Sequence, residues 1–182
     1  MQDPHTFYKT QEQKHKEASK RLFKQLSLLS ILRLLIFGLT ILGIYFTFQN
    51  WKFVIVIAIV GIAAFLFLLS KYTDLKADRA LYRRLVKLNE NELKISKGLF
   101  YDRPDGLEYQ EPNHYFSLDI DLFGRGSFFQ YINRTAIKEG TEKLTKFLLS
   151  NATDHIESKQ KAIQELATKP TWTQNYIAVA QG

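Results

Sequence analysis

Asp119 and Asp121 are the residues whose types and spacing come nearest to a reactive site. Alternate residues of an extended segment face the same way, so the pair could act with His114 as an acid–base or metal site. Two carboxylates without a third cluster of oxygen ligands are, however, more often solvated or helix-capping. We therefore predict no catalytic residue and no metal site in this chain.

Nucleotide and thiol chemistry also lack the residues that they need. No phosphate-binding loop of the form G-x-x-x-x-G-K-[ST] occurs, and Gly124-Arg125-Gly126 has neither a third glycine nor a preceding βαβ pattern. The absence of cysteine excludes disulfides, thiolate metal ligands and a cysteine nucleophile. We predict that this chain itself binds no cofactor.

Two apolar runs, residues 31–48 and 53–69, organise the sequence, and Arg33 is their only charged residue. Each run is close to the roughly 20 residues that cross a bilayer core of about 30 Å. A buried soluble hairpin is the alternative, but its helices would keep a polar stripe. We predict an uncleaved transmembrane hairpin over residues 31–70, embedded in the lipid bilayer, with a turn at residues 49–52.

Basic residues flank the two runs and set the expected orientation. Positive residues beside membrane spans stay in the cytoplasm, so both termini should lie there, in a two-pass protein of a bacterial-type inner or plasma membrane. The chain has a net charge of +7, and because much of its positive charge brackets the runs, we favour anionic lipid over nucleic acid as its partner. The flanking residues are Lys14, Lys16, Lys20, Arg21, Lys24 and Arg33 before the first run, and Lys71, Lys76, Arg79, Arg83, Arg84 and Lys87 after the second.

The segments around the hairpin are polar but keep a helical spacing of apolar residues. Residues 1–30 are predicted as a cytoplasmic basic helix and residues 71–97 as a cytoplasmic helical extension of the second span. The two extensions could pair as an antiparallel stalk or stay apart as solvated helices. Residues 98–117 contain a Pro-Asp-Gly turn and read as a linker or a small β-hairpin.

From residue 118 onward the sequence predicts short helices. Ser127 should cap the first, and residues 140–149 form the second, burying Leu144, Phe147 and Leu148. Asp154 and Glu157 form a capping box for the third, and a fourth follows Pro170 with Thr171 as its cap. The fold class is therefore mostly α.

Residues 118–135 contain the strings Leu-Asp-Ile-Asp-Leu-Phe-Gly, Ser-Phe-Phe-Gln and Asn-Arg-Thr in that order. This pattern resembles the start of the core domain of MutS-related proteins, in particular their membrane-anchored branch. We expect these residues to be structural, with an apolar core that includes Phe128, and with the Asn133 and Arg134 side chains bonding backbone carbonyls or Asp121. The residues that carry the resemblance are Asp119, Asp121, Leu122, Phe123, Gly124, Ser127, Phe129, Asn133, Arg134, Thr135, Gly140, Gln160, Glu165 and Trp172.

The resemblance implies a dimeric ATPase whose helical core joins a nucleotide-binding domain to a DNA clamp. ATP and Mg would belong to the full-length protein, with DNA and a second copy as partners, and residues 118–182 would be the truncated start of the core. Departures from the family are the missing Walker motif, the missing Phe-x-Glu wedge and Lys159 at a position that is usually Arg. The alternative is a small two-span membrane adaptor whose cytoplasmic helices bind a protein partner.

Overall fold

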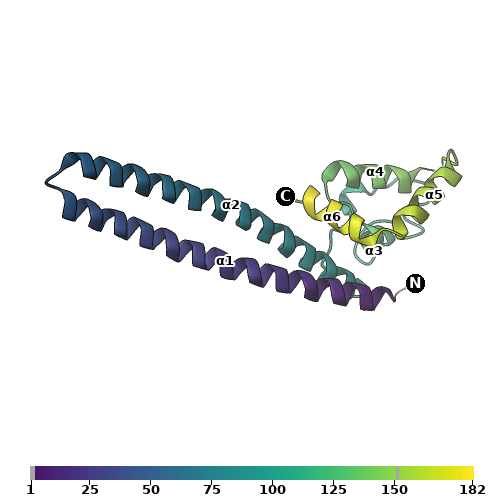
Figure 1. Ribbon diagram of the computed structural model, residues 1–182. Coiled ribbons are helices and arrows are strands. Elements are labelled where there is room, and N and C mark those ends of the chain that lie inside the picture. The colour runs from purple at the N-terminus through teal and green to yellow at the C-terminus, as the bar shows by residue number, and fades with distance from the viewer. Residues whose placement is uncertain (1–2, 151) are drawn as a thin grey trace. The chain divides into compact units, whose positions relative to one another are not determined.

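The computed structural model describes residues 3–150 and 152–182, and within them all regular structure is helical (Figure 1). The expectation of a mostly α fold is thus confirmed, and the β-hairpin considered near residue 104 is wrong, because that segment forms turns and one 3₁₀ turn. The elements are α1 (Pro4–Thr47), α2 (Trp51–Ile95), η1 (Leu107–Tyr109), α3 (Phe128–Ile132), α4 (Lys138–Leu149), α5 (Ile156–Ala167) and α6 (Pro170–Ala180).

The described chain divides into two units. The hairpin unit is Lys14–Arg83, and the terminal unit contains the residues up to Gln13 together with those from Arg84 onward. Each unit has its own packing.

In the hairpin unit, α1 and α2 are each long and apolar enough to cross a membrane. The most apolar 18 residues of α1 are 0 % buried, and those of α2 are 6 % buried. The core helix of a soluble protein would bury such residues against its neighbours. Leu34, Phe46 and Phe67 are instead 71 %, 76 % and 64 % exposed. The large apolar side chains thus form an outward-facing belt.

The connection between the two helices is shorter than the predicted turn at residues 49–52. Helix α1 ends at Thr47 and α2 begins at Trp51, so Trp51 and Lys52 belong to the first turn of α2. The backbone carbonyl of Asn50 accepts hydrogen bonds from the amides of Phe53 and Val54 at 3.0 and 3.3 Å. These bonds start the second helix one residue after the turn.

A seam of less exposed residues runs along each helix of the hairpin unit. On α1 the steps between them alternate between four and three residues, and α2 follows the same rule with one break at Leu68. This spacing is the heptad pattern of paired helices. The seam residues of α1 are Leu22, Leu26, Leu29, Arg33, Ile36, Thr40, Gly43 and Thr47, and those of α2 are Val54, Ile57, Gly61, Ala64, Leu68, Tyr72, Leu75, Arg79 and Tyr82.

Small residues bring the two helices together near the middle of the apolar runs. A Cβ added at Gly61 would overlap the side chain of Thr40, and one added at Gly43 would lie 3.3 Å from Ile57. Close approach at small residues is the usual way in which helices pack within lipid.

Outside the apolar runs, an aromatic ring of one helix meets a cationic or imidazole group of the other helix at two places. The Arg79 guanidinium lies 4.5 Å from the ring centroid of Phe23, and the His15 and Tyr82 rings are 5.8 Å apart. The two basic extensions therefore pair as an antiparallel stalk within the hairpin unit.

The terminal unit has a small apolar core at α3. Leu122, Phe123 and Phe129 are 1 %, 6 % and 0 % exposed and pack together. Ser127 caps α3 as predicted, because its hydroxyl accepts a hydrogen bond from the amide of Gln130 at 3.1 Å. Phe128 does not join this core, since it is 51 % exposed.

Two of the predicted helix caps are wrong. His155, with φ of 61°, is the N-cap of α5, so Asp154 and Glu157 stand one residue out of register for a capping box. Helix α6 begins at Pro170, which suits a first helical position because it has no amide hydrogen to leave unpaired. Thr171 therefore lies inside the helix rather than at its cap.

The predicted burial of Phe147 on α4 is also wrong. This side chain is 51 % exposed, and the ammonium groups of Lys143 and Lys159 lie 4.9 and 5.1 Å from its ring centroid. Leu144 and Leu148 on the same helix pack against the core. Helical spacing thus sends Leu144 and Leu148 inward, while the exposed ring of Phe147 lies beside two lysine ammonium groups.

Residues 98–117, expected as a linker, fold against this core. Gly106 has a φ of 71°, and a Cβ there would lie 2.6 Å from the ring of Phe129. The amide of Gly124 donates to the carbonyl of Asp105 at 2.9 Å. The Pro-Asp-Gly turn therefore closes over α3, and only glycine fits at its third position.

Candidate functional site

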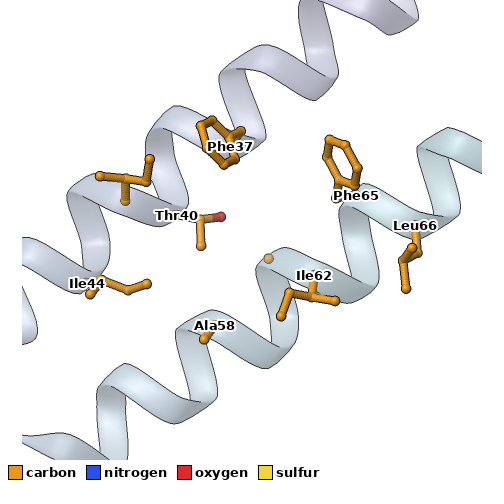
Figure 2. A pocket seen from close by; sticks show the side chains of 9 residues that line it. Phe37, Thr40, Ile44, Ala58, Ile62, Phe65 and Leu66 are labelled. Carbon is orange, nitrogen blue, oxygen red and sulfur yellow. The ribbon is translucent and has the colours of Figure 1, made fainter.

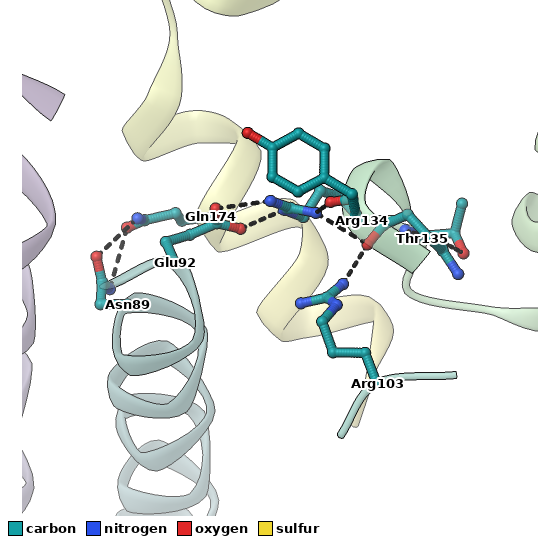
Figure 3. Close-up of polar contacts among 8 residues, drawn as sticks. Asn89, Glu92, Arg103, Arg134, Thr135 and Gln174 are labelled. Atoms are coloured by element: carbon teal, nitrogen blue, oxygen red, sulfur yellow. Dashed lines mark hydrogen bonds and ion pairs between the residues drawn. The ribbon is translucent and has the colours of Figure 1, made fainter. Parts of the chain in front are cut away.

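The terminal unit contains a buried pair of side-chain amides, Asn89 on α2 and Gln174 on α6 (Figure 3). Asn89 is 0 % exposed and Gln174 is 7 % exposed. Gln174 Nε2 donates to Asn89 Oδ1 at 2.8 Å, while Asn89 Nδ2 donates to the Leu85 carbonyl at 2.8 Å. A buried amide left without partners would cost about 1–3 kcal/mol. The pair therefore fastens α6 to the last turns of α2.

One helical turn further along α2, Glu92 forms a two-pronged ion pair with Arg134 (Figure 3). Arg134 Nη2 donates to Glu92 Oε2 at 3.0 Å, and its Nε donates to Oε1. The remaining nitrogen, Nη1, donates to the Tyr131 carbonyl at 2.6 Å. The parallel fork is the strong geometry for arginine and carboxylate. It ties the chain segment after α3 to α2.

The charges of this ion pair contribute to the pKa shifts of two neighbouring groups. Burial lowers the pKa of Arg103, and the nearby charge of Arg134 lowers it further. Burial raises the pKa of the Tyr8 phenol, and the charge of Glu92 adds to that effect. Arg103 also donates to the Asn133 carbonyl, so it is held in place by hydrogen bonding (Figure 3).

Asn133 and Thr135 form a local turn that leads toward α4. Asn133 Oδ1 accepts from the Thr135 amide at 2.9 Å and from its hydroxyl at 2.7 Å. The Thr135 hydroxyl also lies 2.6 Å from the hydroxyl of Thr141 on α4. The Asn-Arg-Thr string therefore acts as a structural junction, with amide, guanidinium and hydroxyl all engaged by the protein.

The structure brings together most of the motif residues but not the carboxylates. Gly124, with φ of 100°, makes the turn into α3, and Arg134 bonds backbone carbonyls as expected, with Glu92 rather than Asp121 as its acidic partner. Asp119 and Asp121 are exposed. His114, which could have joined them, lies 3.0 Å through Nε2 from the Leu149 carbonyl.

The later motif residues lie apart from this junction. Gln160 and Glu165 are exposed on α5, and Glu165 pairs with Lys169. Trp172 is 56 % exposed and stacks on Tyr176 with ring centroids 5.5 Å apart. Gly140 lies in α4 near Thr135. No group of three or more His, Asp or Glu that could hold a metal ion occurs in residues 3–150 and 152–182.

Sequence reasoning assigned no contact to four polar residues that build the site: Asn89, Glu92, Gln130 and Gln174. Gln130 and Gln174 entered it only as part of the motif resemblance. Gln130 is 1 % exposed, accepts from the Gly126 amide at 2.8 Å and donates to the Arg103 carbonyl at 2.6 Å. A signal was present for Asn89, because it follows Leu85 by four residues and so occupies a position of the apolar stripe.

Comparison with protein-family models, curated proteins and solved structures finds no match to this chain. The MutS-like reading of residues 118–182 therefore stays a prediction that rests on the motif residues alone.

Proposed function

We propose that this chain is a two-pass membrane anchor that carries a helical scaffold and performs no catalysis itself. The observation that carries the proposal is the outward-facing apolar belt of α1 and α2, which is bracketed by basic residues. The hairpin unit holds eleven basic and three acidic residues, so it accounts for the whole positive surplus of the chain. In this proposal both termini lie in the cytoplasm of a bacterial-type cell, because basic residues beside membrane spans favour the cytoplasmic side.

The scaffold role follows from the polar contacts of the terminal unit. Helix α2 contains one apolar run, and its last turns hold α6 through Asn89 and the segment after α3 through Glu92. The side chains at this junction bond one another and the backbone. This arrangement is suited to holding a domain in place on a membrane helix.

Topology reporters test the anchor. We expect a reporter fused after Gly182 to be active only in a cytoplasmic assay and a reporter inserted at Asn50 to be active only outside. Substituting Lys14, Lys16 and Lys20 by glutamine should weaken this bias, since basic residues near the spans set it. A chain released from membranes by carbonate without detergent would contradict the proposal.

We further propose that residues 118–182 begin a MutS-like core, so that a full-length protein would use ATP and Mg, bind DNA and form a homodimer. The packed Leu122, Phe123 and Phe129 support it, because they lie where the motif suggests a core. The coding sequence after Gly182 tests it: a Walker loop supports the proposal, and its absence from that frame contradicts it. Binding of DNA by the full chain in vesicles should then fall steeply with salt.

The adaptor is the second candidate, and exposed apolar residues on α6 favour it. Tyr176 and Val179 are 59 % and 65 % exposed beside Trp172. Such a stripe suits a covering partner. A photo-crosslinking amino acid at Tyr176 discriminates the two candidates: capture of another protein supports the adaptor, and capture of downstream residues of the same polypeptide supports the MutS-like core.

A further inference from the structure

An apolar groove lies between α1 and α2 in the middle of the hairpin unit (Figure 2). Its volume is about 380 Å³. Figure 2 shows Phe37 and Phe65 from opposite helices toward one end and Ile44 and Ala58 toward the other. The groove exists beside the close contact of Gly61 with Thr40, where small side chains leave space.

The side chains that line the groove offer water no free hydrogen-bond donor. Its one side chain with a polar atom is Thr40, whose hydroxyl donates to the Ile36 carbonyl at 2.7 Å. A cavity without free polar groups stays dry, because water there would lose its hydrogen bonds. The groove lies within both apolar runs, where hydrocarbon chains are the surrounding solvent. An acyl chain therefore matches its chemistry.

A cation without a counter-ion lies on the same stripe of α1. Arg33, Phe37, Thr40 and Ile44 follow one another at steps of four, three and four residues, so Arg33 lies one helical turn beyond the groove on the same face. Its guanidinium lies 4.3 Å from the ring centroid of Tyr72, from α2.

The guanidinium of Arg33 is left with unused donors. Arg33 Nη2 lies 3.5 Å from Ser30 Oγ, which is a long contact, and its buried Nε has no hydrogen-bond partner. Within the described residues no carboxylate lies at ion-pair distance from Arg33. In proteins an arginine guanidinium commonly binds phosphate, often through two parallel hydrogen bonds.

We propose that the hairpin unit binds one anionic glycerophospholipid, with its phosphate on Arg33, Ser30 and Tyr72 and one acyl chain in the groove. The eleven residue steps from Arg33 to Ile44 rise about 16 Å along the helix, and half of a bilayer core is about 15 Å. An acyl chain that begins beside Arg33 is thus long enough to enter the groove, whose Thr40 lies near the middle of the apolar runs. This site rests on the proposed membrane function, which it sharpens to a particular lipid class.

The headgroup half of the site is tested by native mass spectrometry. The full chain is purified in detergent with equal amounts of dioleoylphosphatidylglycerol and dioleoylphosphatidylcholine. We expect one phosphatidylglycerol to remain bound per chain and Arg33→Gln to reduce that bound fraction about tenfold, since a charged hydrogen-bond donor is lost. Arg33→Lys should keep part of the binding, and Lys52→Gln, which removes a charge at the other end of the span, should keep all of it.

The acyl half is tested by filling the groove. Ala58→Leu adds volume inside it, whereas Ala63→Leu adds the same volume at an exposed position of the same helix. We expect Ala58→Leu to reduce the retained lipid several-fold and Ala63→Leu to leave it unchanged. Circular dichroism and the topology reporters establish that each variant folds and inserts.

The outcomes separate this site from the anchor itself. Equal lipid retention by the parent chain, Arg33→Gln and Ala58→Leu would overturn the lipid site, and so would a lipid-free dimer as the dominant species. In each case correct reporter topology would leave the anchor standing. Failure of the parent chain to insert would instead remove the proposed function.

Discussion

The two units solve the same packing problem in opposite ways. In the hairpin unit most of the large apolar side chains point outward and small ones such as Gly61 lie where the helices come closest, whereas the terminal unit buries Phe129 completely and turns lysines outward. In the proposed membrane setting, lipid gives no hydrophobic drive for helices to associate, so the hairpin would depend on close approach at small residues. Water gives that drive, so the terminal unit depends on large buried rings. Substitutions should therefore act by different mechanisms in the two units.

The largest effect should come from Phe129→Ala in the terminal unit. Removing this fully buried ring leaves a cavity and should cost about 3–5 kcal/mol of unfolding free energy. The neighbouring Phe128→Ala should cost much less, because that ring is half-exposed. Limited proteolysis in detergent measures both. If Phe129→Ala unfolded the hairpin unit together with the terminal unit, the claim that the two units are stabilised separately would be wrong.

A smaller cost should follow Gly61→Ala in the hairpin unit. The added methyl group overlaps Thr40, so the helices must separate, at about 1–3 kcal/mol. Gly38→Ala is the matched control, because nothing lies within 4 Å of its Cβ position. Unfolding by SDS in mixed micelles measures the difference. Equal behaviour of the two alanine variants would show that the seam does not depend on close approach.

The buried amide pair gives a comparable or smaller effect. Gln174→Leu removes the donor to the buried Asn89 Oδ1 and should cost about 1–3 kcal/mol. Replacing both residues by leucine removes both polar groups and should cost less than the single substitution. Exposed Gln160→Leu serves as the control, and urea unfolding of the terminal unit measures all three. A double variant less stable than the single one would argue that the amides stabilise the fold beyond satisfying each other.

The smallest effect concerns pH and the stalk. Burial lowers the pKa of His15, and the nearby charge of Lys14 lowers it further. His15 in the folded stalk therefore binds a proton less readily than in the unfolded chain, where a histidine has a pKa near 6.5. The contribution of neutral His15 to the stability of the stalk is complete above that pH and is lost as the pH falls below it. Spin labels at Ser19 and Lys76 should move apart in acid. His15→Gln should abolish this change, and His5→Gln should keep it.

Much of the hairpin unit could be predicted from sequence, because length and the lack of charge suffice to define a span. The seam could not be predicted, because both runs are apolar on every face and the sequence therefore hides the heptad spacing of the less exposed residues. The one signal of the seam in the sequence is the position of small residues: Thr40 and Gly43 on one helix and Gly61 on the other. Sequence reasoning treated these runs as uniform surfaces.

In the terminal unit, prediction succeeded for local chemistry and failed for distant partners. The cap at Ser127 needs only three residues of sequence and was correct. The Asn89–Gln174 pair joins residues 85 positions apart, so only the folded chain shows it. The expected capping box failed by one residue, because His155 in a left-handed conformation takes the cap position itself.

The brevity of the connection between α1 and α2 bears on how the protein is made. Only three residues separate Thr47 from Trp51, so every contact of the seam near the turn joins residues close in sequence. Such contacts form early and quickly, since little chain entropy opposes them. The second span can thus pair with the first as soon as it leaves the ribosome. In the proposed topology only this short connection crosses the bilayer, so no folded segment has to be transported across it during synthesis.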